Sequence, residues 1–141
     1  MRETKMISAR LEDYMAAIFL IVSEKQVARA KDIAFRLKVS RPSVTGALRS
    51  LSDRGLINYA PYEMITLTSK GRKLAKDVVR RHEILKSFFV EVLGVDEVEA
   101  DEAACKMEHA ISHTIMERLK KFMESIPRGG EEQSISSVQK L

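Results

Sequence analysis

The sequence is poor in several residue types, and each shortage excludes a class of protein. One cysteine among 141 residues rules out an intrachain disulfide framework and favours a reducing compartment, so we expect a cytoplasmic protein. Three prolines and six glycines, together with 31% charged residues, are typical of a mainly helical chain. No run approaches the ~18 apolar residues of a membrane-spanning helix, so no membrane association is expected.

Charge is distributed unevenly along the chain. Residues 1–82 contain 17 Lys and Arg against 8 Asp and Glu, a net of +9. Residues 83–141 contain 7 against 12, a net of −5, and the two values sum to the +4 of the whole chain. A basic first half suits a polyanion such as DNA, whereas an acidic second half suits a cation or a partner chain.

The basic half contains the pattern of a helix-turn-helix. A short amphipathic segment over 30–39 is followed by Ser40, a natural N-cap, and by Pro42, whose missing N–H costs nothing in a first helical turn. The second helix has a short polar outer face whose N-terminal end should enter the major groove; an ordinary helical hairpin is the alternative. The residues predicted to contact DNA are Ser40, Arg41, Pro42, Ser43, Thr45 and Arg49.

A β-hairpin is predicted next, over 56–68. Its two arms are rich in strand-forming residues, and Ala60-Pro61 separates them, so it would form the wing of a winged helix. Apolar residues at helical spacing predict three further helices, at 8–24, about 70–93 and about 101–124.

The predicted fold class is therefore mainly α. A winged helix-turn-helix with a small β-hairpin occupies residues 1–73, and an all-α domain follows over 74–126. Two apolar helices exceed what so small a domain needs, which indicates a dimer interface and hence a homodimer. Residues 127–141, which are rich in Gly, Ser and Gln, are predicted to be a disordered tail.

Metal-ligand side chains are concentrated in the segment 105–109, Cys-Lys-Met-Glu-His. On a helix, the i, i+3, i+4 spacing places Cys105, Glu108 and His109 on one face, in line with an apolar stripe. Polar groups that face a core need partners, and a divalent cation is one such partner. The alternative is a small buried cysteine with the glutamate and the histidine on a hydrated flank.

Two more candidates lie outside this segment. Asp13 lies one step off the apolar face of the first helix, and His82 lies on the apolar face of the long helix. Taken alone, the first is explained by the helix dipole and the second as a core histidine with satisfied hydrogen bonds.

In combination, these pieces resemble the diphtheria toxin repressor family of metal-dependent transcriptional repressors, in its short branch that includes the manganese transport regulators. The resemblance covers about residues 11–124. The matching segments are Leu11-Glu12-Asp13-Tyr14, Ser40-Arg41-Pro42-Ser43-Val44-Thr45, Leu67-Thr68-Ser69-Lys70-Gly71, Arg81-His82-Glu83, Gly94-Val95-Asp96, and Glu102 through His109.

The resemblance implies a DNA-binding repressor of metal-uptake genes, with Mn²⁺ or Fe²⁺ as corepressor, a homodimer, and double-stranded operator DNA as partner. Zn²⁺ or Co²⁺ would also bind in vitro. Asp13 matches the manganese branch and Cys105 matches the iron branch. The implied metal ligands are Asp13, His82, Cys105, Glu108 and His109.

The chain departs from that family pattern at several positions. Ala16 stands where the manganese branch has a second N-terminal carboxylate. Lys86 and Asp101 stand where the iron branch has its ancillary Glu and His ligands, and a charged lysine cannot ligate a metal. Gly46 replaces a polar DNA-contacting side chain of some members, and the third, SH3-like domain of the long members is lacking. One metal or two per chain are both compatible with the sequence.

Two other functions compete with a metal-dependent repressor. A winged-helix regulator that senses no metal would use the residues of segment 105–109 for packing, and its DNA binding would be insensitive to chelator. A small enzyme could use Cys105 as nucleophile and His109 as base. The chain has no recognisable oxyanion loop and little length for a substrate pocket, so we expect no enzymatic activity.

Overall fold

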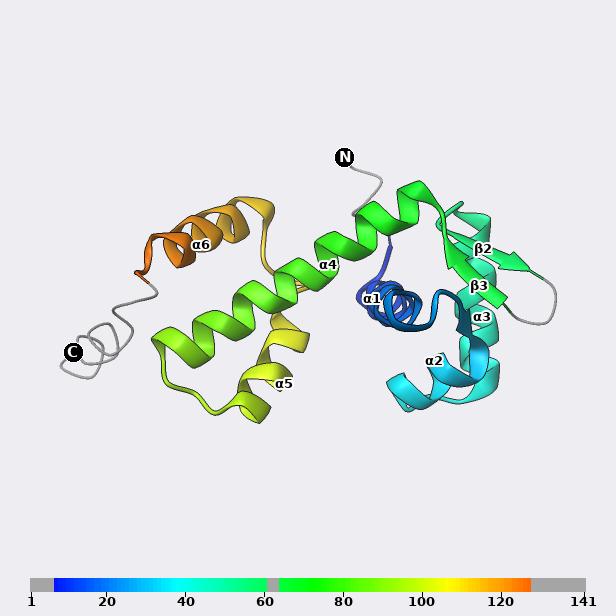
Figure 1. Ribbon diagram of the computed structural model, residues 1–141, viewed down its shortest axis with the longest axis horizontal. Helices are drawn as coiled ribbons and strands as arrows, with labels where there is room; N and C mark the ends of the chain where they lie inside the picture. Colours follow the sequence, from blue (N-terminus) through cyan, green and yellow to red (C-terminus); the bar gives the residue numbers. More distant parts are fainter. Residues whose placement is uncertain (1–6, 61–63, 128–141) are drawn as a thin grey trace. The chain divides into compact units, whose positions relative to one another are not determined.

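The computed structural model describes residues 7–60 and 64–127 and divides into two compact units, 1–79 and 80–141. The described part is mainly helical with a small antiparallel sheet, which confirms the predicted fold class (Figure 1). None of its helices could cross a membrane. In chain order the elements are α1 (Ala9–Lys25), β1 (Ala28–Arg29), α2 (Ala30–Leu37), α3 (Arg41–Asp53), β2 (Ile57–Ala60), β3 (Met64–Leu67), α4 (Ser69–Ser87), a π-helical segment (Phe88–Val92), α5 (Glu97–Met107) and α6 (His113–Ser125).

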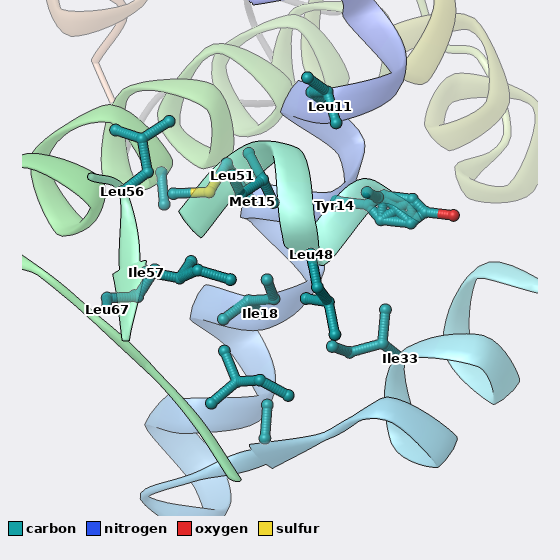
Figure 2. Packing of buried hydrophobic residues seen from close by; sticks show 14 of the residues in the cluster. Leu11, Tyr14, Met15, Ile18, Ile33, Leu48, Leu51, Leu56, Ile57 and Leu67 are labelled. Carbon is teal, nitrogen blue, oxygen red and sulfur yellow. The ribbon is translucent and has the colours of Figure 1, made fainter. Parts of the chain in front are cut away.

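The core of the first unit forms where α1 meets α3. As predicted, α1 begins after Ser8, whose Oγ accepts a hydrogen bond from the Leu11 N–H at 3.2 Å. Met15 and Ile18 of α1 and Leu48 of α3 are completely buried together (Figure 2). Burial of each such side chain contributes about 1.5–3 kcal/mol, so the inner face of α3 is held firmly and its outer face is left to solvent.

The start of α3 follows the sequence prediction closely. Ser40 Oγ accepts from the Ser43 N–H at 3.3 Å, and Pro42 lies in the first turn. The buried face of α3 consists of Val44, Ala47, Leu48 and Leu51. Gly55 follows the helix with φ at +73°, a conformation that glycine adopts without strain and that ends α3.

The sheet contains one strand more than the sequence predicted. β2 and β3 form the expected hairpin, with Tyr59 opposite Ile65. The two-residue strand β1 pairs with the other edge of β3, which gives the order β1-β3-β2. Two residues are too few to show an alternating pattern, so sequence reasoning missed β1. Pro61 of the expected turn and all of the expected tail after Pro127 lie outside the described residues.

Gly71 joins the hairpin to α4. Its N–H donates to Thr68 Oγ1 at 3.0 Å, and the Thr68 hydroxyl donates to the Gly55 carbonyl at 2.8 Å. A Cβ added at Gly71 would lie 1.8 Å from the Leu56 carbonyl oxygen. The close approach of two backbones therefore requires glycine here.

Gly46 on the outer face of α3 is expected to tolerate a side chain. A Cβ added there meets nothing within 4 Å. We predict that Gly46→Ala raises the free energy of unfolding by about 0.5–1 kcal/mol, because alanine loses less backbone entropy in a helix. Urea unfolding of the two proteins measures this difference, and a loss of stability would contradict the exposed helical position.

The second unit has its own small core. Leu85 of α4, Ala104 of α5 and Met116 of α6 are buried against one another. α4 ends at Ser87 and continues as the π-helical segment to Val92. Gly94, with φ at +71°, follows shortly after, where the sequence predicted the end of the long helix.

The prediction of one final helix over 101–124 is wrong. α5 ends at Met107, whose carbonyl accepts from the Ala110 N–H at 2.9 Å, and α6 starts at His113. Ser112 caps α6 by accepting from the Ile115 N–H at 3.2 Å. Ile111 lies in the turn between the two helices, yet it packs against the core. The apolar spacing therefore continues across the interruption between α5 and α6, and periodicity alone cannot detect that interruption.

Candidate metal centre

The candidate metal ligands of the second unit come from α4, α5 and the turn that follows α5. His82 lies on α4, five residues before its end. Asp101 and Cys105 lie one turn apart on α5. Glu108 is the C-cap of α5, and His109 follows it. The core of Leu85, Ala104 and Met116 holds these segments together.

Glu108 is the centre of this arrangement. Its side chain is buried, and Glu108 as a residue is 3% exposed. Glu108 Oε1 lies 2.8 Å from His82 Nδ1, and Oε2 lies 3.4 Å from His109 Nε2. A buried carboxylate is costly unless it is paired, so two imidazoles beside it form a site that suits either protons or a divalent cation.

Arg81 fixes the turn that carries Glu108. Its Nη1 donates to the Glu108 carbonyl at 2.6 Å. This carbonyl lies at the C-terminus of α5, where backbone acceptors lack helical partners and a cation is favoured. Arg81 therefore orients the backbone of Glu108 while His82 orients its side chain.

His82 bridges two carboxylates. Its Nε2 lies 2.7 Å from Asp101 Oδ1, opposite the nitrogen that meets Glu108. The hydrogen bond to Glu108 raises the pKa of His82 above its ordinary value of 6.5, burial lowers it, and Asp101 raises it again. In the metal-free protein the imidazole is therefore stabilised in its protonated form.

We predict that His82 of the metal-free protein titrates above pH 6.5. Because the folded-state pKa is raised, its stabilising contribution is complete below pH 6.5 and disappears as the pH rises through the folded pKa. An NMR titration of the ring protons, assigned with a His82→Gln variant, measures the midpoint. A midpoint below 6.5 would mean that burial outweighs the two carboxylates.

The structure corrects the expected position of Cys105. The sequence placed it on the apolar face, but the thiol is exposed. α5 buries Ala100 and Ala104 instead, which are four residues apart and fill the narrow contact with the rest of the unit. Of the other predicted ligands, Glu108 is buried, His109 is half-buried and Asp13 is exposed on α1 of the first unit.

The implied ligand set left out Asp101, although this residue stands at an ancillary-ligand position of the iron branch. Its carboxylate oxygen, a nitrogen of His82 and the Cys105 Sγ all lie within 4.8 Å of one another. The i, i+4 spacing of Asp101 and Cys105 was a visible signal, but their distance in sequence from His82 concealed the cluster. Imidazole, carboxylate and thiolate donors fit Fe²⁺, Co²⁺ or Zn²⁺, and the carboxylate and imidazoles around Glu108 also fit Mn²⁺.

The predicted DNA-contacting residues all lie on the exposed side of α3 and at its start. Two hydroxyls among them are engaged within the helix. Ser40 Oγ donates to Ser43 Oγ at 3.0 Å, and Thr45 Oγ1 donates to the Arg41 carbonyl at 3.2 Å. Their oxygens keep lone pairs for other donors, while Arg41 and Arg49 bring positive charge to the same surface.

Comparison with known protein families shows which family this chain belongs to. Residues 6–65 match the N-terminal DNA-binding domain of the iron-dependent repressors, and residues 68–135 match their metal-binding and dimerisation domain. The chain belongs to the iron-dependent repressor family. Both domains of a metal-dependent, DNA-binding transcriptional regulator are thus present in this family member, in the predicted order.

Individual relatives agree with the family assignment. An uncharacterized HTH-type transcriptional regulator of Methanocaldococcus jannaschii is 43% identical over 119 residues, which is 84% of this chain and 95% of the relative. The HTH-type transcriptional regulator MntR of Bacillus subtilis is 32% identical over 136 residues, covering 96% of this chain and 95% of the relative.

Solved structures show the same fold. The manganese regulator SloR has a TM-score of 0.73 and 31% identity over 82% of this repressor-family chain. IdeR of T. acidophilum has a TM-score of 0.72 and 26% identity over 80% of the chain. The match covers 54% and 53% of those two proteins, so the chain spans about half the length of each.

Proposed function

We propose that this protein is a transcriptional repressor whose affinity for operator DNA is controlled by Mn²⁺ or Fe²⁺. The observation that carries the proposal is the buried Glu108 carboxylate between His82 and His109. This pairing provides a preformed, partly dehydrated site for a divalent cation, next to a family-typical DNA-binding domain. The proposed ligand set is Asp13, His82, Cys105, Glu108 and His109.

The ligand set suggests how binding would be coupled to DNA recognition. Asp13 belongs to the unit that contains α3, whereas the other four ligands belong to the second unit. An ion shared by both would reduce their relative freedom and fix the spacing of the recognition helices in a dimer, roughly 34–36 Å. The metal then favours the DNA-competent state by its higher affinity for that state.

The donors support two choices of metal. Carboxylates and imidazoles suit Mn²⁺ and Fe²⁺. The structural relative SloR is described as a manganese regulator. The Cys105 thiolate is softer and adds affinity for Fe²⁺, Co²⁺ or Zn²⁺. We propose Mn²⁺ or Fe²⁺ as the physiological metal, with Zn²⁺ and Co²⁺ binding in vitro.

The charges and exposed surfaces of the two parts of the chain suggest a separate role for each. Residues 1–73 would bind DNA in the cytoplasm through Ser40, Arg41, Pro42, Ser43, Thr45 and Arg49. Residues 74–126 would bind metal and dimerise, and exposed apolar side chains of α6 support this role: Ile115 is 55% and Phe122 is 47% exposed. A second copy of the chain would cover them. Repression would act on genes for metal uptake.

Removing the metal is the direct test. A binding sequence is selected from random duplex DNA with Mn²⁺ present, and its affinity is then measured at one salt concentration with Mn²⁺ and with chelator. We expect Mn²⁺ to strengthen binding about 5- to 150-fold, the usual range of coupling between two sites. Equal affinity in both conditions would support a winged-helix regulator that does not sense metal.

A further inference from the structure

The two most exposed large apolar side chains of the described residues lie among charges of opposite sign. Phe35 of α2 is 87% exposed, and Val98 of α5 is 68% exposed. We propose that they are the centres of two complementary surfaces through which one copy of the chain docks onto another, α2 of the first copy against α5 of the second. This contact goes beyond the proposed function and does not depend on control by metal.

The first surface is formed by cations around Phe35. α2 buries Ile33 on its inner side and leaves Phe35 on the outer side. Lys31 lies one turn before the ring, Lys38 follows one turn after it at the helix end, and Arg36 adjoins it. All three cations are exposed. An aromatic ring within a polar rim has the composition of an interface anchor. We call Lys31, Phe35, Arg36 and Lys38 the α2 surface.

The second surface is formed by carboxylates around Val98. Glu97 and Glu99 adjoin it in the chain, and Glu102 lies one turn further along the same exposed face. The carboxylate of Asp96 accepts from the Val98 N–H at 3.1 Å, so the backbone of this first turn is held in place. The helix dipole explains the acids at the start of α5 but not the exposed valine. We call Glu97, Val98, Glu99 and Glu102 the α5 surface.

The two surfaces are complementary in charge. Each has one apolar residue at its centre, with three positive charges around Phe35 and three negative charges around Val98. Two α2 surfaces repel each other, and so do two α5 surfaces, so the favourable pairing is α2 against α5. Such a contact is heterologous. Every copy offers one surface of each kind, and the assembly grows from copy to copy unless it closes into a ring.

DNA is the alternative partner for the α2 surface, because phosphates also attract its three cations. DNA gives no role to Val98, however, since the carboxylates around that residue repel a polyanion. A second copy of the chain accounts for both surfaces at once. Each surface has only four residues, so the contact lies at the small end of protein interfaces, below about 1,200 Å², and is weak and dependent on concentration.

The assembly can be measured by sedimentation velocity. The full-length protein is studied with Mn²⁺ and without DNA, at increasing protein concentration and an ionic strength of about 0.1 M, where charges act over about 10 Å. We expect the average mass to rise with concentration. At about 1 M salt the screening length falls to about 3 Å, and the rise should disappear.

Two variants test the pairing of the surfaces. Phe35→Glu and Val98→Lys each replace the apolar centre with the charge that the opposite surface repels. Each alone should raise the dissociation constant of the contact about tenfold or more. Both side chains are exposed, so neither variant should affect folding. An equal mixture should associate again, because one variant keeps an intact α5 surface and the other an intact α2 surface. Lys73→Glu, at an exposed position of α4, is the control and should assemble like the original protein.

Four results would overturn the inference. The first is an average mass of the original protein that does not change with concentration, as a contact inside one copy would also give. The second is unchanged assembly in Phe35→Glu or in Val98→Lys. The third is a mixture that fails to associate. The fourth is a Phe35→Glu protein with weaker DNA binding but normal assembly, which would assign the α2 surface to DNA. DNA affinity that ignores chelator would refute the proposed function alone, because the assembly is measured without DNA.

Discussion

Metal-dependent DNA binding is expected to disappear in Glu108→Gln. The substitution removes the charge of the buried carboxylate between His82 and His109 but keeps an oxygen that can accept a hydrogen bond from His82. Outer-shell partners of a metal are already worth about 10- to 100-fold in affinity, so the loss of a charged inner ligand should weaken Mn²⁺ binding at least about 100-fold. Calorimetry on the stripped protein, followed by DNA binding at fixed salt, measures both effects.

Glu117→Gln serves as the matched control. Glu117 lies in the same unit and pairs with Arg80 at 3.7 Å, but both side chains are well exposed. Exposed ion pairs contribute about 0–1 kcal/mol to the free energy of unfolding. Glu117 is not among the proposed metal ligands. Its metal and DNA affinities should therefore match those of the original protein. If Glu108→Gln behaved the same way, the buried carboxylate would have no role in metal binding.

Gly71→Ala is expected to destabilise the first unit by about 3 kcal/mol, at the upper end of overpacking costs. The added methyl would lie 1.8 Å from the Leu56 carbonyl oxygen and 2.8 Å from its carbon. Both belong to the backbone, so no side-chain rotation can relieve the clash. The hairpin must move away from α4, and the Thr68 hydrogen bonds must shift with it.

The comparison with Gly46→Ala makes this measurement specific. Both variants replace a helical glycine with alanine, but the position of Gly46 is open and that of Gly71 is filled. Urea unfolding should show a higher free energy of unfolding for Gly46→Ala and a much lower one for Gly71→Ala. Equal and small changes would mean that the hairpin and α4 are not in close contact in solution.

Much of the fold could be predicted because its signals are local. Ser8 and Ser40 cap their helices through hydrogen bonds to residues three positions later, so the sequence alone locates the starts of α1 and α3. The inner face of α3 could also be predicted, because its apolar residues recur at helical spacing. The remaining polar residues of α3 form the outer face, which contains the predicted DNA-binding surface.

The final helix shows where local signals fail. Ile111 fits the apolar spacing of a single long helix, yet it lies between α5 and α6 and reaches the same core from the connecting turn. Periodicity reports which residues are buried but not whether the backbone between them is continuous. For the same reason the spacing of Cys105, Glu108 and His109 predicted one common face, whereas the thiol and the carboxylate differ completely in exposure.

The sequence by itself determined the winged helix-turn-helix, the segment that carries the candidate metal ligands and the resemblance to metal-dependent repressors. Tertiary structure decided which donors meet. His82 is 26 residues from Glu108 and 19 from Asp101, and they come together because Leu85, Ala104 and Met116 pack α4, α5 and α6 into one core. Contacts of that range depend on packing between separate segments, and no local pattern in the chain encodes them.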